Sequence, residues 1–220
     1  MTRRSFVIFI FSFFVLWTGT WLLHQLLVLH FGLWDASQSG RDTVYWASMK
    51  FVVWVLFPWL YWRKRISNIR DFIGLSPSTI KRGYRWGSVA TVVWVILILS
   101  SIVIRHQHFT GVSNWPAFIY TILLTPIVEE IMFRGFIISG LLVLKVEEKR
   151  ANVITTLLFV LIHVVGWSFQ GVLVANLTST AWLSIALVSM IAGFIRIHSG
   201  SLRASILLHI GNNTIAGFLA

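Results

Sequence analysis

The sequence has 220 residues, of which 57% are hydrophobic and 15% aromatic, and its mean hydropathy is +0.81. Charged residues make up 11% of the chain, less than half of the ~25% that soluble domains usually carry. This composition excludes a soluble globular domain, and the amount of apolar surface excludes intrinsic disorder. The remaining class is a polytopic membrane protein.

The formal net charge of +11 does not indicate nucleic-acid binding. The basic residues lie in short connections between apolar runs, and no RNA- or DNA-binding motif accompanies them. The chain contains no cysteine, which excludes thiol catalysis, disulfides and thiolate metal sites.

Seven apolar segments predict an all-α, polytopic transmembrane helix bundle of about seven spans. The expected spans are residues 6–33, 44–62, 86–104, 117–144, 151–169, 172–195 and 203–220. The first run is too long for the apolar region of a signal peptide, so we expect it to be a retained span. We divide the chain into N-terminal transmembrane helices, residues 1–105, and a second unit, residues 117–220.

The connections between spans differ in charge and predict the orientation. Fourteen of the 18 Lys and Arg residues lie in alternate connections that share one side, and two lie on the other side. Basic connections remain in the cytoplasm. We therefore expect the N-terminus in the cytoplasm and the C-terminus outside.

The fourth span carries three charges close to its middle, Glu129, Glu130 and Arg134. Each charge at a helix centre costs roughly 2.5–3.5 kcal/mol on insertion, so this helix must bury its polar face against partner helices. Glu130 and Arg134 are four residues apart and can form an ion pair, whereas Glu129 points about 100° away. One carboxylate is then neutralised while the other stays available as a base.

Two further spans carry histidine beside a second polar or aromatic residue. Phe159 and His163 share a helix face in the fifth span, and His209 and Asn213 share one in the seventh. Ionisable groups at this depth are functional candidates by default. Lys50, near the middle of the second span, is expected to extend its amine toward the membrane surface.

The residues in these three spans match the motifs of a known family. EExxxR is present at Glu129–Arg134, FxxxH at Phe159–His163 and HxxxN at His209–Asn213, in that order and on separate spans. Residues 117–220 therefore resemble the CPBP family of CAAX proteases and bacteriocin-processing proteins, also called Abi. This family is related to the type II CAAX prenyl endopeptidases.

The resemblance implies an intramembrane endopeptidase. In characterised relatives the substrate is a lipid-modified C-terminus, from which the last three residues are removed after a prenylated cysteine. Bacterial relatives have proposed roles in bacteriocin maturation or self-immunity. We expect a multi-pass protein of a bacterial cell membrane, whose partners are the lipid bilayer and a membrane-anchored peptide or protein substrate, with no nucleic acid.

The motif residues can support peptide hydrolysis. Glu129, together with His163, can hold and deprotonate a water molecule and pass the proton to the leaving nitrogen. His209 and Asn213 can donate hydrogen bonds to the developing oxyanion. We expect these four residues to be catalytic.

A second group is expected to support the first. Glu130 and Arg134 would fix the catalytic side chains or bind a substrate carboxylate, and Phe159 completes the second motif. A zinc ion on Glu129, His163 and His209 is the chemical alternative, since two histidines and a glutamate form a catalytic zinc set. We favour the metal-free reaction.

Two other functions compete with the endopeptidase. One is a non-catalytic membrane protein, an immunity protein or scaffold, that retains the motifs for packing. The other is a proton-coupled transporter that uses the buried glutamates, which an internal repeat would support. The sequence shows no such repeat, and its motif positions are intact.

Overall fold

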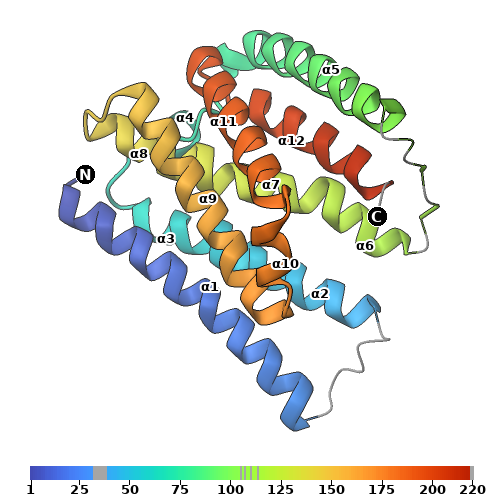
Figure 1. The fold of residues 1–220 in the computed structure, drawn as a ribbon. Helices are drawn as coiled ribbons and strands as arrows, with labels where there is room; N and C mark the ends of the chain where they lie inside the picture. The colour runs from blue at the N-terminus through green and yellow to red at the C-terminus, as the bar shows by residue number, and fades with distance from the viewer. Residues whose placement is uncertain (32–38, 105, 107, 110, 113, 219–220) are drawn as a thin grey trace.

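The computed structural model describes residues 1–31, 39–104, 106, 108–109, 111–112 and 114–218 (Figure 1). Within these ranges every regular element is a helix, which confirms the all-α bundle. The ends of the first and last predicted spans, residues 32–33 and 219–220, lie outside the described residues.

The α-helices differ greatly in length, from four to 29 residues. They are α1 (Arg3–Phe31), α2 (Ser39–Lys50), α3 (Phe57–Trp62), α4 (Ile69–Phe72), α5 (Ile80–Ile104), α6 (Trp115–Ile119), α7 (Thr125–Glu130), α8 (Ile138–Val143), α9 (Glu148–Gln170), α10 (Leu173–Thr178), α11 (Ala181–Ser199) and α12 (Leu202–Gly217).

Three π-helical segments join short α-helices into longer rods. Phe51–Leu56 connects α2 to α3, and Tyr120–Leu124 and Ile131–Ile137 connect α6, α7 and α8. The predicted second and fourth spans are therefore continuous helices with altered winding at these segments. Such π-helical turns occur frequently at functional sites, and here two of them flank α7.

Five helical segments of the described residues are long and apolar enough to cross a membrane, which supports an integral membrane protein. They are Arg3–Leu29, Arg41–Trp62, Ile69–Ile104, Glu148–Gln170 and Ala181–Ser199.

The other two predicted spans are helical but do not meet the same criteria. Helix α12 has 16 residues, and the α6–α8 rod carries three charged residues near its centre. The predicted span at 172–195 is interrupted at Ser179–Thr180 between α10 and α11, so the membrane-length helix there is α11.

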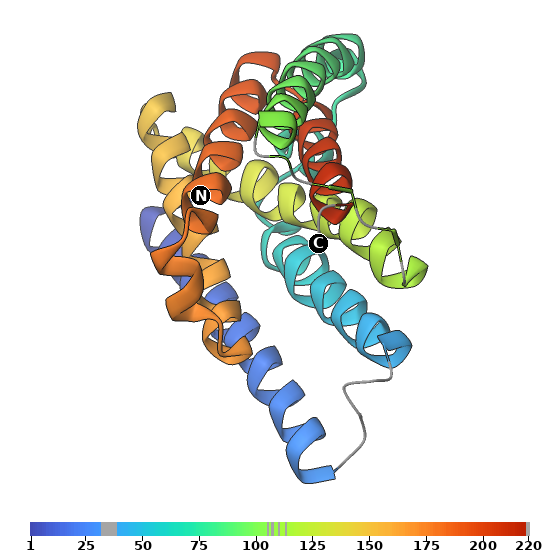
Figure 2. The same ribbon diagram turned by 45° about the vertical axis from the view of Figure 1, so that its right-hand side comes forward.

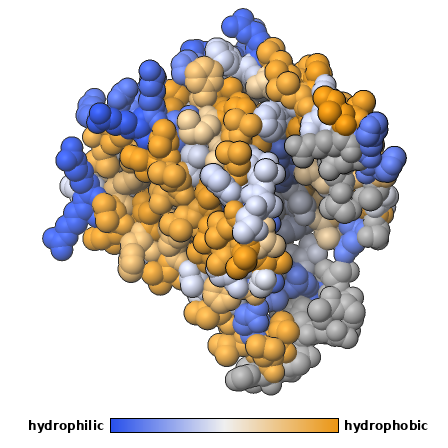
Figure 3. All heavy atoms as spheres, in the orientation of Figure 1, coloured by the Kyte–Doolittle hydropathy of each residue, from blue (hydrophilic) through white to orange (hydrophobic). Residues whose placement is uncertain are grey.

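The outer surface of the bundle is strongly apolar. Figure 3 shows a broad hydrophobic face with hydrophilic residues mostly toward its margins. Much of α5 presents large aliphatic side chains on the outside, among them Val89, Val92, Val93, Ile96 and Leu97. A contiguous exposed apolar surface of this extent is typical of contact with lipid.

The largest hydrophobic core joins the two halves of the chain. One cluster of buried side chains contains Phe9 and Phe13 of α1, Trp54 of the α2–α3 rod, and Phe133 and Phe159 of the motif-bearing helices. Helices α1 and α9 run side by side in both ribbon views (Figures 1 and 2). The N-terminal helices therefore form part of the wall around the motif-bearing helices.

Small residues allow two pairs of helices to approach closely. A Cβ atom at Gly87 of α5 would lie 2.9 Å from the Ala204 backbone of α12. A Cβ atom at Gly193 of α11 would overlap the side-chain amide of Asn152 on α9. Close contacts at small residues are the usual means of helix association in membranes.

Candidate active site

The α6–α8 rod places both glutamates in the interior. Glu129 and Glu130 end α7, and the two residues are 5% and 0% exposed. Pro126 lies at the start of α7, directly after the first π-helical segment of this rod. Both carboxylates need cationic or hydrogen-bonding partners at this depth, because an unpaired buried charge is strongly unfavourable.

Glu130 forms the ion pair that its spacing predicts. Arg134 Nη1 donates to Glu130 Oε1 at 2.8 Å. Nη2 of the same guanidinium donates to the backbone oxygen and the hydroxyl of Ser189 on α11, at 2.9 and 2.8 Å. The guanidinium also lies 4.7 Å from the centre of the Phe159 ring.

Arg134 is 1% exposed, and neither it nor Glu130 lines either of the two cavities that Glu129 lines. Of the two roles expected for this pair, the contacts favour fixing the catalytic side chains over binding a substrate carboxylate. Its contacts tie the α6–α8 rod to α9 and α11, which fixes the helices that carry the other motif residues.

Glu130 has a second partner that its sequence position does not reveal. His209 of α12 places Nδ1 2.9 Å from Glu130 Oε1. Because an ionised carboxylate only accepts hydrogen bonds, this contact places a proton on Nδ1. The other ring nitrogen, Nε2, lies 3.8 Å from Glu129 Oε2.

His163 is oriented by its own helix. Its Nδ1 lies 2.7 Å from the backbone oxygen of Phe159 one turn earlier. A carbonyl can only accept, so Nδ1 carries the proton and Nε2 of the neutral ring is an acceptor. Such a contact fixes both the tautomer and the ring orientation of a functional histidine.

Phe159 lies between the functional groups. Its ring centre is 4.8 Å from that of His163 and 5.9 Å from that of His209, and both pairs are arranged edge to face. With the guanidinium of Arg134 on the same ring, Phe159 contacts one polar residue from each of the three motifs. This explains structurally why an aromatic residue stands one turn before His163.

Asn213 is held at the C-terminal part of α12. Its Nδ2 donates to the backbone oxygen of Thr121 at 3.0 Å, and its Oδ1 accepts from Asn212 at 3.1 Å. Asn212 in turn accepts from the indole of Trp94 on α5. This chain of contacts orients the Asn213 amide relative to the α6–α8 rod.

Two cavities meet at Glu129. One, of about 560 Å³, is lined by Glu129, His163, His209 and Asn213 together with apolar residues of α5 and α11. The structure thus brings all four predicted catalytic residues to one cavity, from α7, α9 and α12.

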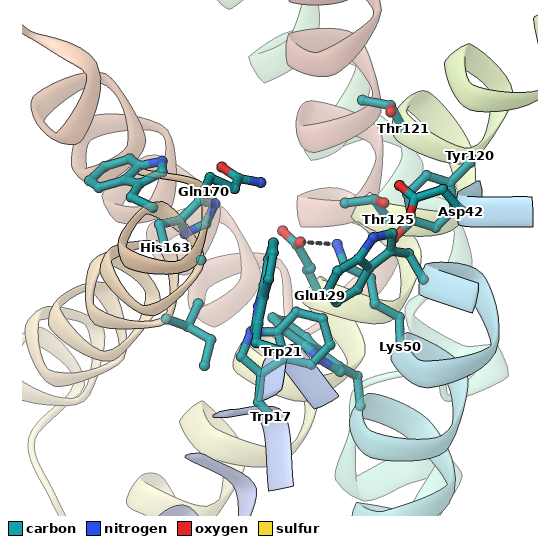
Figure 4. Close-up of a pocket in the computed structure, with 15 residues that line it drawn as sticks. Trp17, Trp21, Asp42, Lys50, Tyr120, Thr121, Thr125, Glu129, His163 and Gln170 are labelled. Carbon is teal, nitrogen blue, oxygen red and sulfur yellow. Dashed lines mark hydrogen bonds and ion pairs between the residues drawn. The ribbon is translucent and has the colours of Figure 1, made fainter. Parts of the chain in front are cut away.

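The other cavity, of about 410 Å³, lies on the side of the N-terminal helices. Figure 4 shows Glu129 and His163 facing it, opposite Lys50 and beside Trp17 and Trp21 of α1. Glu129 and His163 line both cavities, so a substrate on one side and water on the other could both reach them.

Comparison with known families agrees with this geometry. Residues 111–215 match the sequence model of a family described as Type II CAAX prenyl endopeptidase Rce1-like. Over these residues the chain is similar to the CPBP/CAAX protease family. The matched region contains the three motifs and begins close to the predicted boundary of the second unit. No curated protein and no solved structure matches the chain.

The family match does not account for every residue of the site. Lys50 lies outside the matched region, yet its Nζ is 2.6 Å from Glu129 Oε1. The expectation that Lys50 extends toward the membrane surface is wrong, because its side chain points into the bundle and finds a carboxylate there. The signal in the sequence was that Lys50 lies inside the predicted span 44–62 with no acidic residue in the same span to pair with it.

A second residue that the sequence analysis missed is Thr125, which lines both cavities. It lies one turn before Glu129 and therefore on the same face of the helix. The spacing of four residues between Thr125 and Glu129 could have identified Thr125 as a candidate site residue.

The arrangement does not fit a zinc ion. Among the described residues, no group of three His, Cys, Asp or Glu side chains is placed to hold a metal. In addition, the carboxylate of Glu129 already binds the ammonium of Lys50, and this positive charge would repel a dication at the same oxygen.

Proposed function

We propose that this protein is an intramembrane endopeptidase that hydrolyses a peptide bond near a membrane-associated substrate terminus. The observation that carries the proposal is the meeting of Glu129, His163, His209 and Asn213 at one cavity inside an apolar bundle. The match of residues 111–215 to the CAAX prenyl endopeptidase family supports the same reaction class. As in those relatives, the terminus can be prenylated.

Glu129 and His163 are the groups that would activate water. Glu129 Oε1 is held by Lys50, while Oε2 faces His209 at 3.8 Å and keeps capacity to accept a proton. The Nε2 atom of His163 can accept a second hydrogen bond from the same water. After attack on the carbonyl carbon, the protonated Glu129 returns the proton to the leaving nitrogen.

Two donors can stabilise the oxyanion that forms on the substrate carbonyl. Nδ2 of Asn213 has two hydrogens, of which Thr121 accepts one, so the other can serve the oxyanion. His209, whose Nε2 lies 3.8 Å from Glu129 Oε2, supplies a donor at Nε2 in the form of the ring that carries a hydrogen on both nitrogens. Each such donor contributes about 2.7–4 kcal/mol in enzymes where it has been removed.

Glu130, Arg134 and Phe159 are positioning residues in this proposal. Glu130 fixes the proton of His209 on Nδ1, and Arg134 holds Glu130 in place. Phe159 supports both histidine rings. None of these three needs to touch the substrate to be required for activity.

The test is cleavage of a membrane-anchored peptide reporter whose C-terminus carries a prenylated cysteine followed by three residues. Wild type and Glu129→Gln are compared at equal abundance, and an unprenylated reporter forms a second arm. Cleavage that depends on Glu129 supports the proposal, and the second arm shows whether the lipid is needed. If neither reporter is cleaved, or both variants cleave equally, the endopeptidase is refuted in favour of a non-catalytic immunity or scaffold protein.

A further inference from the structure

The N-terminal half of the chain contributes one charged group to the candidate active site. Lys50 ends α2, at the point where the α2–α3 rod changes from α- to π-helical winding. Its ammonium forms a 2.6 Å contact with Glu129 Oε1, and its side chain is about nine-tenths buried. Figure 4 shows the two groups pointing toward one another across the cavity.

Two aromatic rings flank the ammonium at the wall of the cavity. Its Nζ lies 5.3 Å from the centre of the Trp54 ring and 5.7 Å from that of Tyr120. Aromatic faces stabilise a cation at these distances, most strongly where water is excluded. Within the described part of the chain, Glu129 is the carboxylate that lies within ion-pair distance of Lys50.

The two adjacent glutamates therefore have separate cations. Arg134 binds Glu130, and Lys50 binds Glu129, in both cases through the Oε1 atom. Binding Oε1 fixes the rotation of the Glu129 carboxylate and leaves Oε2 on the side of His209. A carboxylate that acts as a base must be held in this way, since a displacement of about 1 Å can reduce the rate about 10²-fold.

We propose that Lys50 is a positioning residue for the reaction, whose ammonium orients the Glu129 carboxylate so that Oε2 faces water and the scissile carbonyl. This inference rests on the endopeptidase function proposed above. It makes the N-terminal helices a part of the active site, although the family match begins at residue 111.

The test compares Lys50→Met and Lys50→Arg in the full-length chain with the prenylated reporter. Lys50→Met should reduce kcat about 10²-fold with KM nearly unchanged, because the role proposed for the ammonium is to orient Glu129 and not to bind the substrate. Lys50→Arg keeps a cation at this position and should recover part of the lost kcat. In a Glu129→Gln background, Lys50→Met should cause no further loss.

Arg196→Met is the matched control for removal of a buried cation. Arg196 is 6% exposed and donates to Ser139, but it lines neither cavity. This variant should lower the amount of folded protein while the kcat of the folded fraction stays at the wild-type value. A wild-type kcat in Lys50→Met, or equal losses in Lys50→Met and Arg196→Met, would overturn the inference.

A measurement that needs no substrate separates this inference from the proposed function. Thermal unfolding of wild type, Lys50→Met, Glu129→Gln and the double variant forms a double-mutant cycle. The double variant should melt well above the temperature expected from adding the two single effects, because it leaves no unpaired charge. Additive effects would overturn the Lys50 inference, whereas an inactive wild type with strong coupling would overturn only the endopeptidase.

Discussion

Glu129 and Glu130 are neighbours in the sequence, but their surroundings give them different tasks. Glu129 lines both cavities and has one close cationic contact. Glu130 lines neither cavity and binds both Arg134 and His209. The first can meet water and substrate, whereas the second holds other side chains in place.

Substitution of each glutamate by glutamine should separate these tasks. Glu130→Gln leaves Arg134 without a counter-ion in a fully buried position, which costs about 3–5 kcal/mol, so we expect a large loss of folded protein. Glu129→Gln should cost less, because Lys50 can still reach the cavity, but should reduce kcat at least 10²-fold. Thermal unfolding and reporter cleavage measure the two effects. Equal stability and equal residual activity would contradict this division.

Asn213 allows a test of the oxyanion donor. Asn213→Ala should reduce kcat about 10²–10³-fold with little change in KM, because the hydrogen bond strengthens only as charge develops. Thr214→Ala is the control, since the Thr214 hydroxyl donates to the backbone of its own helix at Ile210. An equal loss of kcat in both variants would mean that Asn213 acts only through the packing of α12.

The contact between Lys50 and Glu129 also bears on metal dependence. A bound ammonium and a zinc ion would compete for the same carboxylate. We therefore expect reporter cleavage to persist after treatment with a strong zinc chelator and removal of the chelated metal. A loss of activity that added zinc restores would show that Glu129 and the two histidines rearrange around the metal.

At the scale of helices, the sequence predicts more of the bundle than of the site. Apolar runs predict the helices, and intervals of four residues place Glu130 with Arg134 and Phe159 with His163 on common faces. The interruption at Ser179–Thr180 lies within a mostly apolar segment, so hydropathy alone does not reveal it. The partners of Lys50 and His209 lie 79 residues away along the chain, and no local pattern specifies which helix faces meet.

Close helix packing predicts a strong effect at a single glycine. Gly193→Ala should reduce folded protein and melting temperature, because the new Cβ would overlap Asn152 where α9 meets α11. Gly19→Ala in α1 is the control, because no atom outside its own helix lies within 4 Å of a Cβ atom there. Melting curves of the two variants give the comparison. If both melt like wild type, α9 and α11 are not packed at this distance.

At the scale of the whole molecule, the basic connections gather at one end of the bundle. Leu202 donates its backbone N–H to Gly74, so the α11–α12 turn lies against the segment before α5. Tyr61 near the end of α3 donates to Ser5 at the start of α1. In Figure 1 the N-terminus and the α8–α9 turn lie toward the same upper left side. These are the connections that the charge count places in the cytoplasm.

We therefore expect the active site to open toward the cytoplasm. His209 lies seven residues after Leu202, roughly 10 Å from the basic end at 1.5 Å per residue. Water and a substrate terminus then reach Glu129 from that end, while a lipid group approaches sideways between helices. Cysteine substitution can test the orientation, because the native chain has no cysteine.

Ser67 and Thr180 provide a matched pair for this experiment, since both are exposed. Ser67 lies in a connection predicted to be cytoplasmic, whereas Thr180 lies between α10 and α11, at the opposite end of α11 from the α11–α12 turn. In intact cells, Ser67→Cys should react only with membrane-permeant thiol reagents, whereas Thr180→Cys should also react with impermeant ones. Reaction of Ser67→Cys with an impermeant reagent from outside would reverse the orientation. The site would then open away from the cytoplasm, and its substrates would have to present their termini on the outer face.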